Sequence, residues 1–97
     1  MNSKKYKIKA RVWKWPGDGG WHFVTLDKKL SAQIKETHGK GLLRGTFTIG
    51  KTSWETSLLP HKLSQAYLIA IKSSVRKQEG IFPGDEIQIS FNLVNML

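Results

Sequence analysis

Alternation of apolar and polar residues with a period of two recurs in six short segments of this chain, and it restricts the fold to one built mainly from β-strands. The first segment is residues 5–15. One face of this segment carries Tyr6, Ile8, Ala10 and Val12. The other face carries basic and aromatic side chains, namely Lys5, Lys7, Lys9, Arg11, Trp13 and Trp15. Residues 16–20 end the strand, because proline cannot donate to a sheet ladder and glycines favour turns.

Five further strands are predicted along the rest of the chain. They are residues 21–26, 42–49, 52–59, 66–71 and 86–94. Gly50 and Lys51 form a two-residue turn, with glycine at the first position as a type II′ turn requires. We expect Pro60 to end the fourth strand and residues 61–65 to form a polar loop. The last strand turns one set of side chains inward, namely Ile87, Ile89, Phe91 and Leu93.

Two short helices are predicted between these strands. Asp27 is an N-cap candidate, because its carboxylate can accept from the exposed backbone N–H groups of a first helical turn, and Gly39 is placed to end that helix. Either Ser73 or Ser74 caps the second helix, which ends at Gly80.

The two halves of the chain show the same order of elements. Residues 24–30 parallel residues 69–75, and each half reads as a strand, a capped helix, a glycine and a strand. A chain of 97 residues forms one domain with one modest core. We therefore expect residues 1–97 to be a single all-β domain with two short helices. The expected architecture is a small six-stranded barrel or a strongly curved antiparallel sheet, built from two weakly similar halves.

The composition excludes some classes of function and leaves others open. The net charge is +9, from 16 basic and 7 acidic residues, which permits contact with nucleic acid, acidic proteins or anionic ligands without choosing between them. Cysteine is absent, which excludes disulfides and thiolate chemistry and fits a reducing cytoplasm. The sequence shows no signal peptide, and no apolar run approaches the roughly 18–20 residues of a membrane span. We expect a cytoplasmic protein that makes no membrane contact.

Three groups of residues carry a resemblance to a known family. They are residues 21–26 with 30–35, residues 48–54, and residues 67–72 with 75–77, 80–81 and 84–87. Together they resemble the bacterial DUF1905 family, a domain of unknown function that in some members is joined to a YdeI/OmpD-associated-type domain. The resemblance covers nearly the whole chain and looks like the stand-alone form. It implies a small β-barrel, and it implies no established activity.

The basic face of the first strand is one candidate site. Lys5, Lys7, Lys9 and Arg11 are spaced about 6.6–6.8 Å apart along a strand and are continued by Trp13 and Trp15, with Lys14 between the two rings. Charge beside aromatic faces is how single-stranded nucleic acid is held without sequence preference. The alternative is that the lysines keep the protein soluble and protect an edge strand.

The tryptophans define a second candidate, a site for a small ligand. We expect Trp21, on the inner face of the second strand, and Trp54 to belong to the core or its rim, where an aromatic-lined mouth can hold a ligand. Trp13 and Trp15 either point outward or fold over the end of the barrel. If the two halves enclose one core, the basic side chains of Lys51, Lys72 and Arg76 converge on an anion; otherwise they are solvated.

Catalysis and metal binding have the weakest support in this sequence. His22, His38 and His61 are scattered, and neither a nucleophile motif nor a paired-carboxylate spacing is present. We expect a non-enzymatic binding module with a basic, aromatic-rich rim, no cofactor and no metal. Its ligand is unknown, an anionic small molecule or nucleic acid being the candidates. Nucleic-acid binding through residues 5–15 is one alternative, and a self-associating scaffold that forms a homodimer is another.

Overall fold

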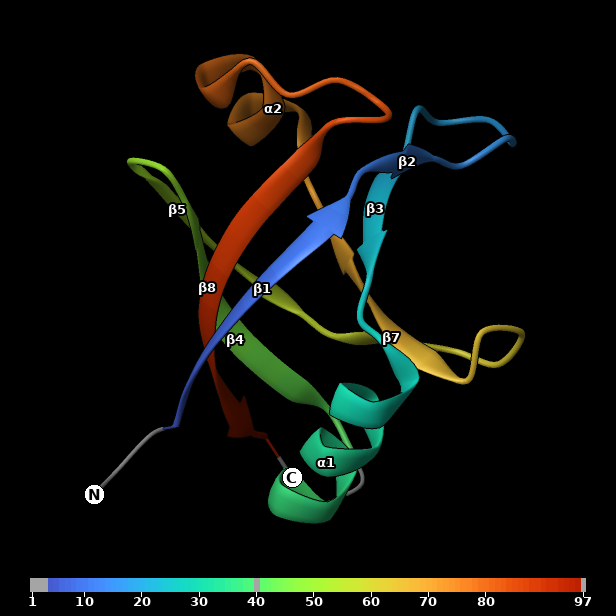
Figure 1. Ribbon diagram of the computed structural model, residues 1–97, viewed down its shortest axis with the longest axis vertical. Coiled ribbons are helices and arrows are strands. Elements are labelled where there is room, and N and C mark those ends of the chain that lie inside the picture. The colour runs from blue at the N-terminus through green and yellow to red at the C-terminus, as the bar shows by residue number, and fades with distance from the viewer. Residues whose placement is uncertain (1–3, 40, 97) are drawn as a thin grey trace.

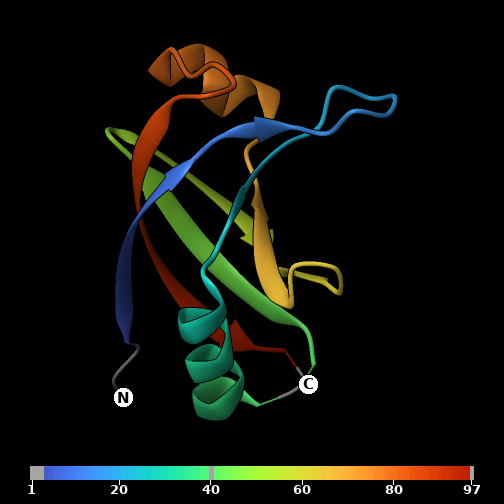
Figure 2. The ribbon, with the colours of Figure 1, turned by 45° about the vertical axis from the view of Figure 1, so that its right-hand side comes forward.

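Two antiparallel sheets of four strands each contain the β structure of this protein, for which the computed structural model describes residues 4–39 and 41–96 (Figure 1). Sheet A has the order β1 (Lys5–Arg11), β8 (Glu86–Asn95), β4 (Leu43–Ile49) and β5 (Thr52–Ser57). Sheet B has the order β2 (Trp13–Lys14), β3 (His22–Thr25), β7 (Ala66–Ala70) and β6 (Leu59–His61). The helices α1 (Lys28–His38) and α2 (Ser73–Glu79) lie at opposite ends of the molecule (Figure 2).

The chain passes directly from sheet A to sheet B at two buried residues. Val12 lies between β1 and β2, where its N–H donates to the Asp85 carbonyl at 2.9 Å and its carbonyl accepts from Gly84 N–H at 2.8 Å. Leu58 lies between β5 and β6 and donates to the Leu43 carbonyl at 2.9 Å. Each of the two long strands predicted from the sequence is therefore a pair of strands, one in each sheet.

The prediction that Pro60 ends the fourth strand is wrong. Pro60 lies inside β6, and His61, which was predicted to be in a loop, is the last residue of that strand. β6 is an edge strand of sheet B and pairs with β7 on one side. Proline is compatible with an edge strand because its missing N–H can lie on the open side of the sheet.

The predicted fold class is confirmed at the level of its elements. The structure is mostly β, all strand pairs are antiparallel, and the described residues form the two expected helices. The pairing differs from the expected architecture because the strands form two sheets, and in residues 4–39 and 41–96 no ring of paired strands closes. The choice between a barrel and a strongly curved sheet stays a prediction.

Helix α1 begins and ends where the sequence predicts. The Asp27 carboxylate accepts from Leu30 N–H at 2.6 Å, and Gly39, with φ of 80°, donates to the Lys35 carbonyl as the C-cap. The buried hydroxyl of Ser31 accepts from Tyr67 N–H at 3.1 Å, which fastens this helix to β7. The cap and this contact together fix α1 at one end of the sheets.

The N-cap of helix α2 is Lys72, one residue before Ser73 and two before Ser74, so neither predicted cap is correct. Lys72 has extended backbone and makes no capping hydrogen bond through its side chain, and Ser73 is already helical. Within the helix, Val75 is fully buried. The predicted stop is confirmed, because Gly80 takes the left-handed conformation, with φ of 65°.

The two halves of the chain meet in the core at corresponding positions. β3 pairs with β7 and brings Val24 opposite Ile69, while β4 pairs with β8 and brings Phe47 opposite Phe91. All four side chains are fully buried, and the two phenylalanine rings stack with centroids 5.1 Å apart. The repeated order of strand, helix and strand is thus present in both halves, and each half supplies sheet partners to the other.

Candidate ligand-binding site

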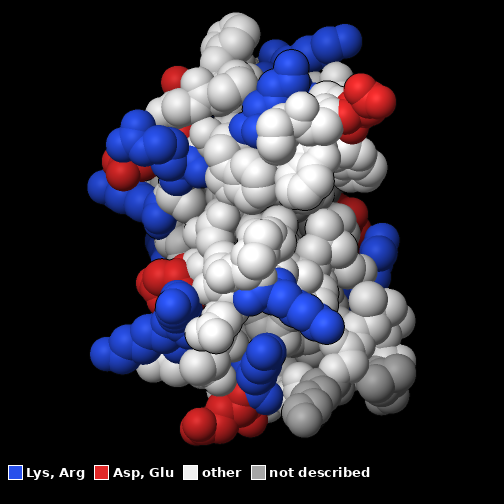
Figure 3. Space-filling view, turned by 90° about the vertical axis from the view of Figure 1, so that its right-hand side faces the viewer, with Lys and Arg blue, Asp and Glu red and all other residues white. Residues whose placement is uncertain are grey.

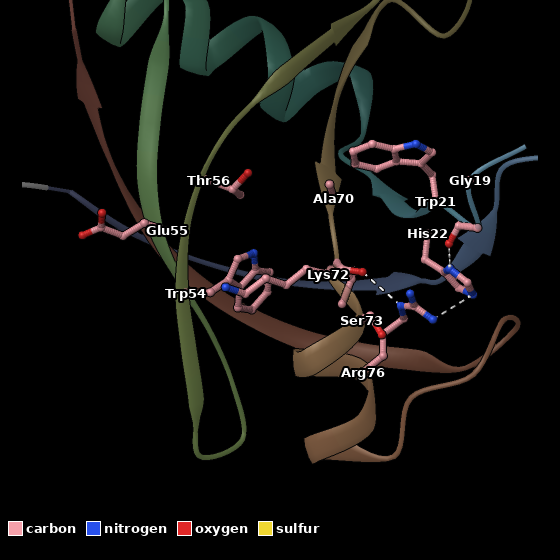
Figure 4. A pocket seen from close by; sticks show the side chains of 12 residues that line it. Gly19, Trp21, His22, Trp54, Glu55, Thr56, Ala70, Lys72, Ser73 and Arg76 are labelled. Carbon is pink, nitrogen blue, oxygen red and sulfur yellow. Dashed lines mark hydrogen bonds between the residues drawn. The ribbon is translucent and has the colours of Figure 1, made fainter.

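A cavity of about 280 Å³ lies where the two sheets separate between β5 and β7 (Figure 4). β5 belongs to sheet A and β7 belongs to sheet B. The chain leaves β5 at Leu58 and enters β6, which pairs with β7 in sheet B. The cavity is lined by residues 54–56 of β5, residues 70–73 at the end of β7, residues 19–22 before and at the start of β3, and Arg76 of α2.

Trp54 forms the deep wall of this cavity and carries an unpaired polar atom. Only 5% of the residue is exposed, and its ring packs on Phe47 with centroids 5.7 Å apart. Its indole Nε1 is the one buried side-chain nitrogen or oxygen in residues 4–39 and 41–96 that no protein acceptor reaches. A buried donor without an acceptor costs about 1–3 kcal/mol.

Arg76 lines the cavity with its guanidinium held by two hydrogen bonds. Its Nε donates to the Ile71 carbonyl at 3.1 Å, and its Nη1 lies 3.4 Å from Nε2 of His22. Figure 4 shows the guanidinium between these two partners. A guanidinium has five N–H groups, so three remain for a ligand. Because it is already oriented, Arg76 loses little rotational freedom when it binds an anion.

His22 is nearly buried and its hydrogen bonds define its protonation state. It is 7% exposed, and its Nδ1 lies 2.7 Å from the Gly20 carbonyl oxygen. A carbonyl can only accept, so Nδ1 carries the proton, and Nε2 then accepts from Arg76 through its lone pair. The imidazole in this arrangement is neutral, and it positions Arg76 without adding charge to the cavity.

Two charged side chains point toward the cavity. Lys72 and Arg76 are both cationic, whereas the Glu55 side chain points away from the cavity on the other side of β5 (Figure 4). The hydroxyls of Thr56 and Ser73 add polar groups to the same lining. In the view of Figure 4 the Lys72 side chain extends toward Trp54 from the end of β7. The site therefore combines a net positive charge with an apolar wall.

Trp21 reaches the rim of the cavity from an orientation that the sequence did not predict. It precedes β3 instead of lying on its inner face, and 55% of it is exposed. Its ring stacks on Phe23 with centroids 6.1 Å apart and an interplanar angle of 5°. The prediction of an inward Trp21 is wrong because the inward positions of this segment are His22, Val24 and Leu26, which places Trp21 on the outer face with Phe23. The expected core-or-rim placement of Trp54 is confirmed.

Trp13 and Trp15 lie outside the cavity, in an aromatic cluster on sheet B. The Trp13 ring is 5.2 Å from Phe23 and 6.4 Å from Trp15 between centroids, and its Nε1 donates to Thr25 Oγ1 at 2.9 Å. Trp15 is 42% exposed. Phe23 alternates with the core residue Val24 and is not part of the main core, so these rings cover the outer face of sheet B. They do not fold inward as a lid.

The space-filling view of that side of the molecule shows an uncharged central area with Lys and Arg side chains above and below it (Figure 3). Gly17 and Gly19 of the preceding loop pack against the Trp15 and Trp21 rings; a Cβ on Gly17 would come within 2.5 Å of the Trp15 Nε1. The glycines of this loop therefore allow the backbone to approach the indoles closely.

The basic residues of the first strand stay exposed, and Lys51 does not join the cavity. Four side chains of β1 lie opposite β8, with Lys5 facing Asn92, Lys7 facing Ser90, Lys9 facing Gln88 and Arg11 facing Glu86. Lys14 is exposed on β2. Lys51 lies at the turn between β4 and β5, where its backbone N–H donates to the Glu79 carboxylate at 3.4 Å. Of the predicted ligand-binding residues, the cavity brings together Trp21, Trp54, Lys72 and Arg76.

Four polar residues of the cavity were not predicted as site residues. They are His22, Glu55, Thr56 and Ser73. His22 was considered as a metal ligand, and the described residues contain no group of three His, Cys, Asp or Glu side chains that could hold a metal ion. Trp54 and Arg76 lie in different halves of the chain, and the cavity forms where the two halves meet. This placement is the feature of the sequence that could have indicated the site.

The fold and the cavity define the class of this protein as a small β-rich domain with two helices and a pocket between its sheets. The chain belongs to the family described as Domain of unknown function (DUF1905), whose model matches residues 9–91. No curated protein matches the chain. Among the described residues, no helix has the length and apolar character that crossing a membrane requires.

Proposed function

We propose that this protein is a non-enzymatic binding module that holds a small ligand in the cavity between β5 and β7. The observation that carries the proposal is the guanidinium of Arg76, which lines the cavity and is held by the Ile71 carbonyl and by His22. A cation that is already oriented by protein partners loses little rotational freedom when it binds an anion.

Two features support binding rather than catalysis. Both ring nitrogens of His22 are engaged, one with the Gly20 carbonyl and one with Arg76, so this imidazole has no free lone pair for general-base work. The Glu55 carboxylate is exposed on an edge strand and points away from the cavity. The two cations of the lining, Lys72 and Arg76, instead suit recognition of an anion.

The test is a titration of the protein with a fragment library, followed by NMR of the indole N–H groups. A cavity ligand shifts the Trp54 indole resonance and leaves that of Trp15, which lies outside the cavity, unchanged. The Arg76→Gln variant removes the oriented guanidinium and weakens the binding of the same fragments. A library in which no fragment moves the Trp54 resonance would contradict the proposal.

Single-stranded nucleic acid is a second candidate partner, favoured by the register of β1 and β8. Lys5, Lys7 and Lys9 face neutral side chains across the strand pair, so no carboxylate directly opposite offsets their charge. Phosphates can therefore reach a row of exposed cations, and bases can stack on the exposed Trp15 ring. This candidate predicts tryptophan quenching by oligo-dT that weakens steeply with salt.

A matched pair of triple variants tests this candidate. Lys5→Gln, Lys7→Gln and Lys9→Gln together lower the slope of log K against log salt, whereas the same change of charge at Lys28, Lys29 and Lys77 on the helices does not. The control lysines are exposed and lie on α1 and α2. No quenching at low salt would remove nucleic acid from the candidates.

Self-association and a cytoplasmic location complete the proposal. The exposed rings of Trp15 and Trp21 on sheet B support association of two copies, which analytical ultracentrifugation measures as a rise in mass with concentration. The Trp15→Lys variant places a charge in that surface and is expected to give a monomer. The absence of cysteine supports a reducing compartment.

A further inference from the structure

We infer that the ligand of the cavity between β5 and β7 is a short extended peptide that carries a carboxylate and adds to the free edge of β5 as a further strand. This inference rests on the proposed binding function. Three properties of the cavity lead to it: the free backbone edge of β5, a second backbone edge on β7 across the cavity, and the two cations of the lining.

The free edge of β5 faces the cavity. β5 is an outer strand of sheet A, and within the described part of the chain it pairs with β4 alone. Successive residues of an antiparallel strand turn their N–H and carbonyl groups to opposite sides. Leu58 continues the register of β5 and donates to the Leu43 carbonyl at 2.9 Å, on the side of β4. Trp54 and Thr56 share this alternation and also face β4, so Glu55 between them directs its N–H and carbonyl to the free edge. Glu55 therefore lines the cavity with its backbone while its side chain points away (Figure 4).

A second backbone edge lies across the cavity on β7. Ile71 donates its N–H to the His22 carbonyl at 2.9 Å, which is on the side of β3. Ala70, the preceding residue, turns its N–H and carbonyl to the opposite side. β6 covers that side of β7 only at residues 66–68, so it ends before Ala70. Figure 4 shows β5 and β7 on opposite sides of the cavity, which thus lies between two strand edges.

An extended peptide matches such edges better than a compact molecule does. A strand presents N–H and carbonyl groups alternately along both of its sides, and paired strands lie about 4.7–4.9 Å apart. Edge strands of natural proteins are commonly protected by lysine or proline. The outer strand β1 carries Lys5, Lys7 and Lys9, and the outer strand β6 contains Pro60. β5 has neither residue type, so its edge is open to the addition of a peptide strand.

The cations of the cavity select a peptide that carries a carboxylate. The guanidinium of Arg76 is oriented by the Ile71 carbonyl at 3.1 Å and by His22, and three of its N–H groups remain for a ligand. Lys72 lines the same cavity and is exposed, so its flexible side chain can turn toward an arriving anion. A carboxylate accepts charge-assisted hydrogen bonds from both donors. An acidic side chain and a free C-terminus both supply this group, and the choice of probes distinguishes them.

Four peptides test the inference in the full protein. The parent is an acetylated and amidated pentapeptide with the sequence threonine, valine, glutamate, valine, threonine. A second peptide has glutamine at the centre, and a third is this glutamine peptide with a free C-terminus. The fourth is the parent with N-methyl groups on alternate amides, made in both possible registers.

Hydrogen exchange of single backbone amides, measured by NMR, reports strand pairing directly. The parent peptide at saturation is expected to slow exchange of the Glu55 N–H about tenfold or more. The N–H of Thr56 already faces β4, so its exchange is expected to stay the same and is the internal control. At least one N-methylated register is expected to lose about tenfold or more in affinity, because it cannot donate to the edge. The amidated glutamine peptide is expected to bind about tenfold more weakly than the parent, which is the effect of one charge-assisted hydrogen bond.

Two variants locate the contacts. Glu55→Pro removes the N–H that faces the free edge and no N–H that faces β4, so the protein is expected to fold and to lose binding of the parent peptide. Arg76→Gln is expected to weaken the parent about tenfold while leaving the glutamine peptide unaffected. Lys77→Gln makes the same change of charge at an exposed position of α2 outside the cavity and leaves binding of both peptides unchanged. Far-UV circular dichroism confirms that each variant is folded.

The outcomes separate this inference from the proposed function. If the parent peptide binds without slowing exchange of the Glu55 N–H, or if both N-methylated registers bind as tightly as the parent, strand addition is overturned and the cavity remains a ligand site. If the amidated glutamine peptide binds as tightly as the parent, the carboxylate is overturned; if only the free C-terminus restores binding, the C-terminus is its source. If the Glu55 amide is protected by raising the protein concentration alone, a second copy occupies the edge and the inference is overturned. If no peptide binds, the inference fails, and the proposed function fails only when the fragment library also leaves the Trp54 resonance unmoved.

Discussion

Replacing Trp54 by phenylalanine is expected to change the free energy of unfolding by no more than about 1 kcal/mol, although the residue is buried in the core. Substitution of a buried tryptophan usually costs more, because the smaller side chain leaves a void. At this position the substitution also removes a buried N–H group that has no protein acceptor. The two effects oppose each other.

The magnitude follows from three terms. In Trp54→Phe, replacing the two-ring indole by a single phenyl ring leaves a void of roughly 40 Å³, which costs about 1 kcal/mol at 24 cal/mol per Å³. Loss of its apolar burial costs about 1 kcal/mol more. Removal of the unpaired donor offsets these costs by about 1–3 kcal/mol. The Trp54→Ala variant has no such compensation for its larger void and is expected to lose about 3–5 kcal/mol.

Urea unfolding followed by far-UV circular dichroism measures these values without relying on indole fluorescence. Trp13→Phe is the matched control, because the Trp13 Nε1 is satisfied by Thr25 Oγ1 at 2.9 Å and its loss breaks that bond. We expect Trp13→Phe to cost at least as much as Trp54→Phe, although Trp13 is only half-buried. A cost of about 3 kcal/mol or more for Trp54→Phe would refute the reasoning, since it would mean that the indole N–H is already bonded in the free protein.

Three further predictions concern the fold. Asp27→Ala removes the cap of α1 and is expected to cost about 0.5–2 kcal/mol in urea unfolding, whereas Asp18→Ala in the exposed loop changes stability by less than about 0.5 kcal/mol. Gly45→Ala is expected to unfold the protein or lower its midpoint strongly, because a Cβ there would meet the Asn92 backbone oxygen at 2.3 Å in the middle of sheet A; a normal thermal midpoint would contradict this packing. Burial raises the pKa of the Tyr6 and Tyr67 hydroxyls, so the unfolded state ionises first and stability falls as pH rises above about 10. Ultraviolet titration at alkaline pH checks this, and ionisation of both tyrosines at the ordinary pKa in the folded protein would count against it.

Local sequence signals predicted the elements that depend on neighbouring residues. Asp27 and Gly39 fixed α1 because a capping carboxylate and a C-terminal glycine act within a few residues of each other. Gly50 predicted the turn between β4 and β5, and its φ of 58° is the value that a type II′ turn requires at this position. Alternation predicted the inward set of β8, of which Ile89, Phe91 and Leu93 are fully or nearly buried.

The features that were missed depend on contacts between distant segments. The strand change at Leu58 and the inclusion of Pro60 in β6 follow from pairing with β7, which local propensity does not report. The start of α2 was missed because neither serine is its cap: the N-cap is Lys72, whose side chain makes no capping hydrogen bond. Trp21 was assigned to the wrong face of its strand, because alternation does not say which of the two faces meets the core.

The site was predicted in part for the same reason. Trp54 was singled out as one of four tryptophans, and Lys72 and Arg76 were singled out by their position four residues apart at the start of the second helix. The sequence did not predict that His22 positions Arg76. The two residues are 54 positions apart, and their contact is visible only once β3 and α2 are placed together.

The register of β1 has a consequence for how the protein is made. Lys5 pairs with Asn92 and Arg11 with Glu86, so the first strand finds its partner only after β8 has been synthesised. Contacts this distant in sequence carry a large loop-closure entropy and slow the folding reaction. During translation β1 is therefore an unpaired strand with one apolar face, a species that is prone to associate with other chains. The lysines on its opposite face are positively charged throughout that interval, and like charges on other copies repel them, so this face opposes association before the strand is paired.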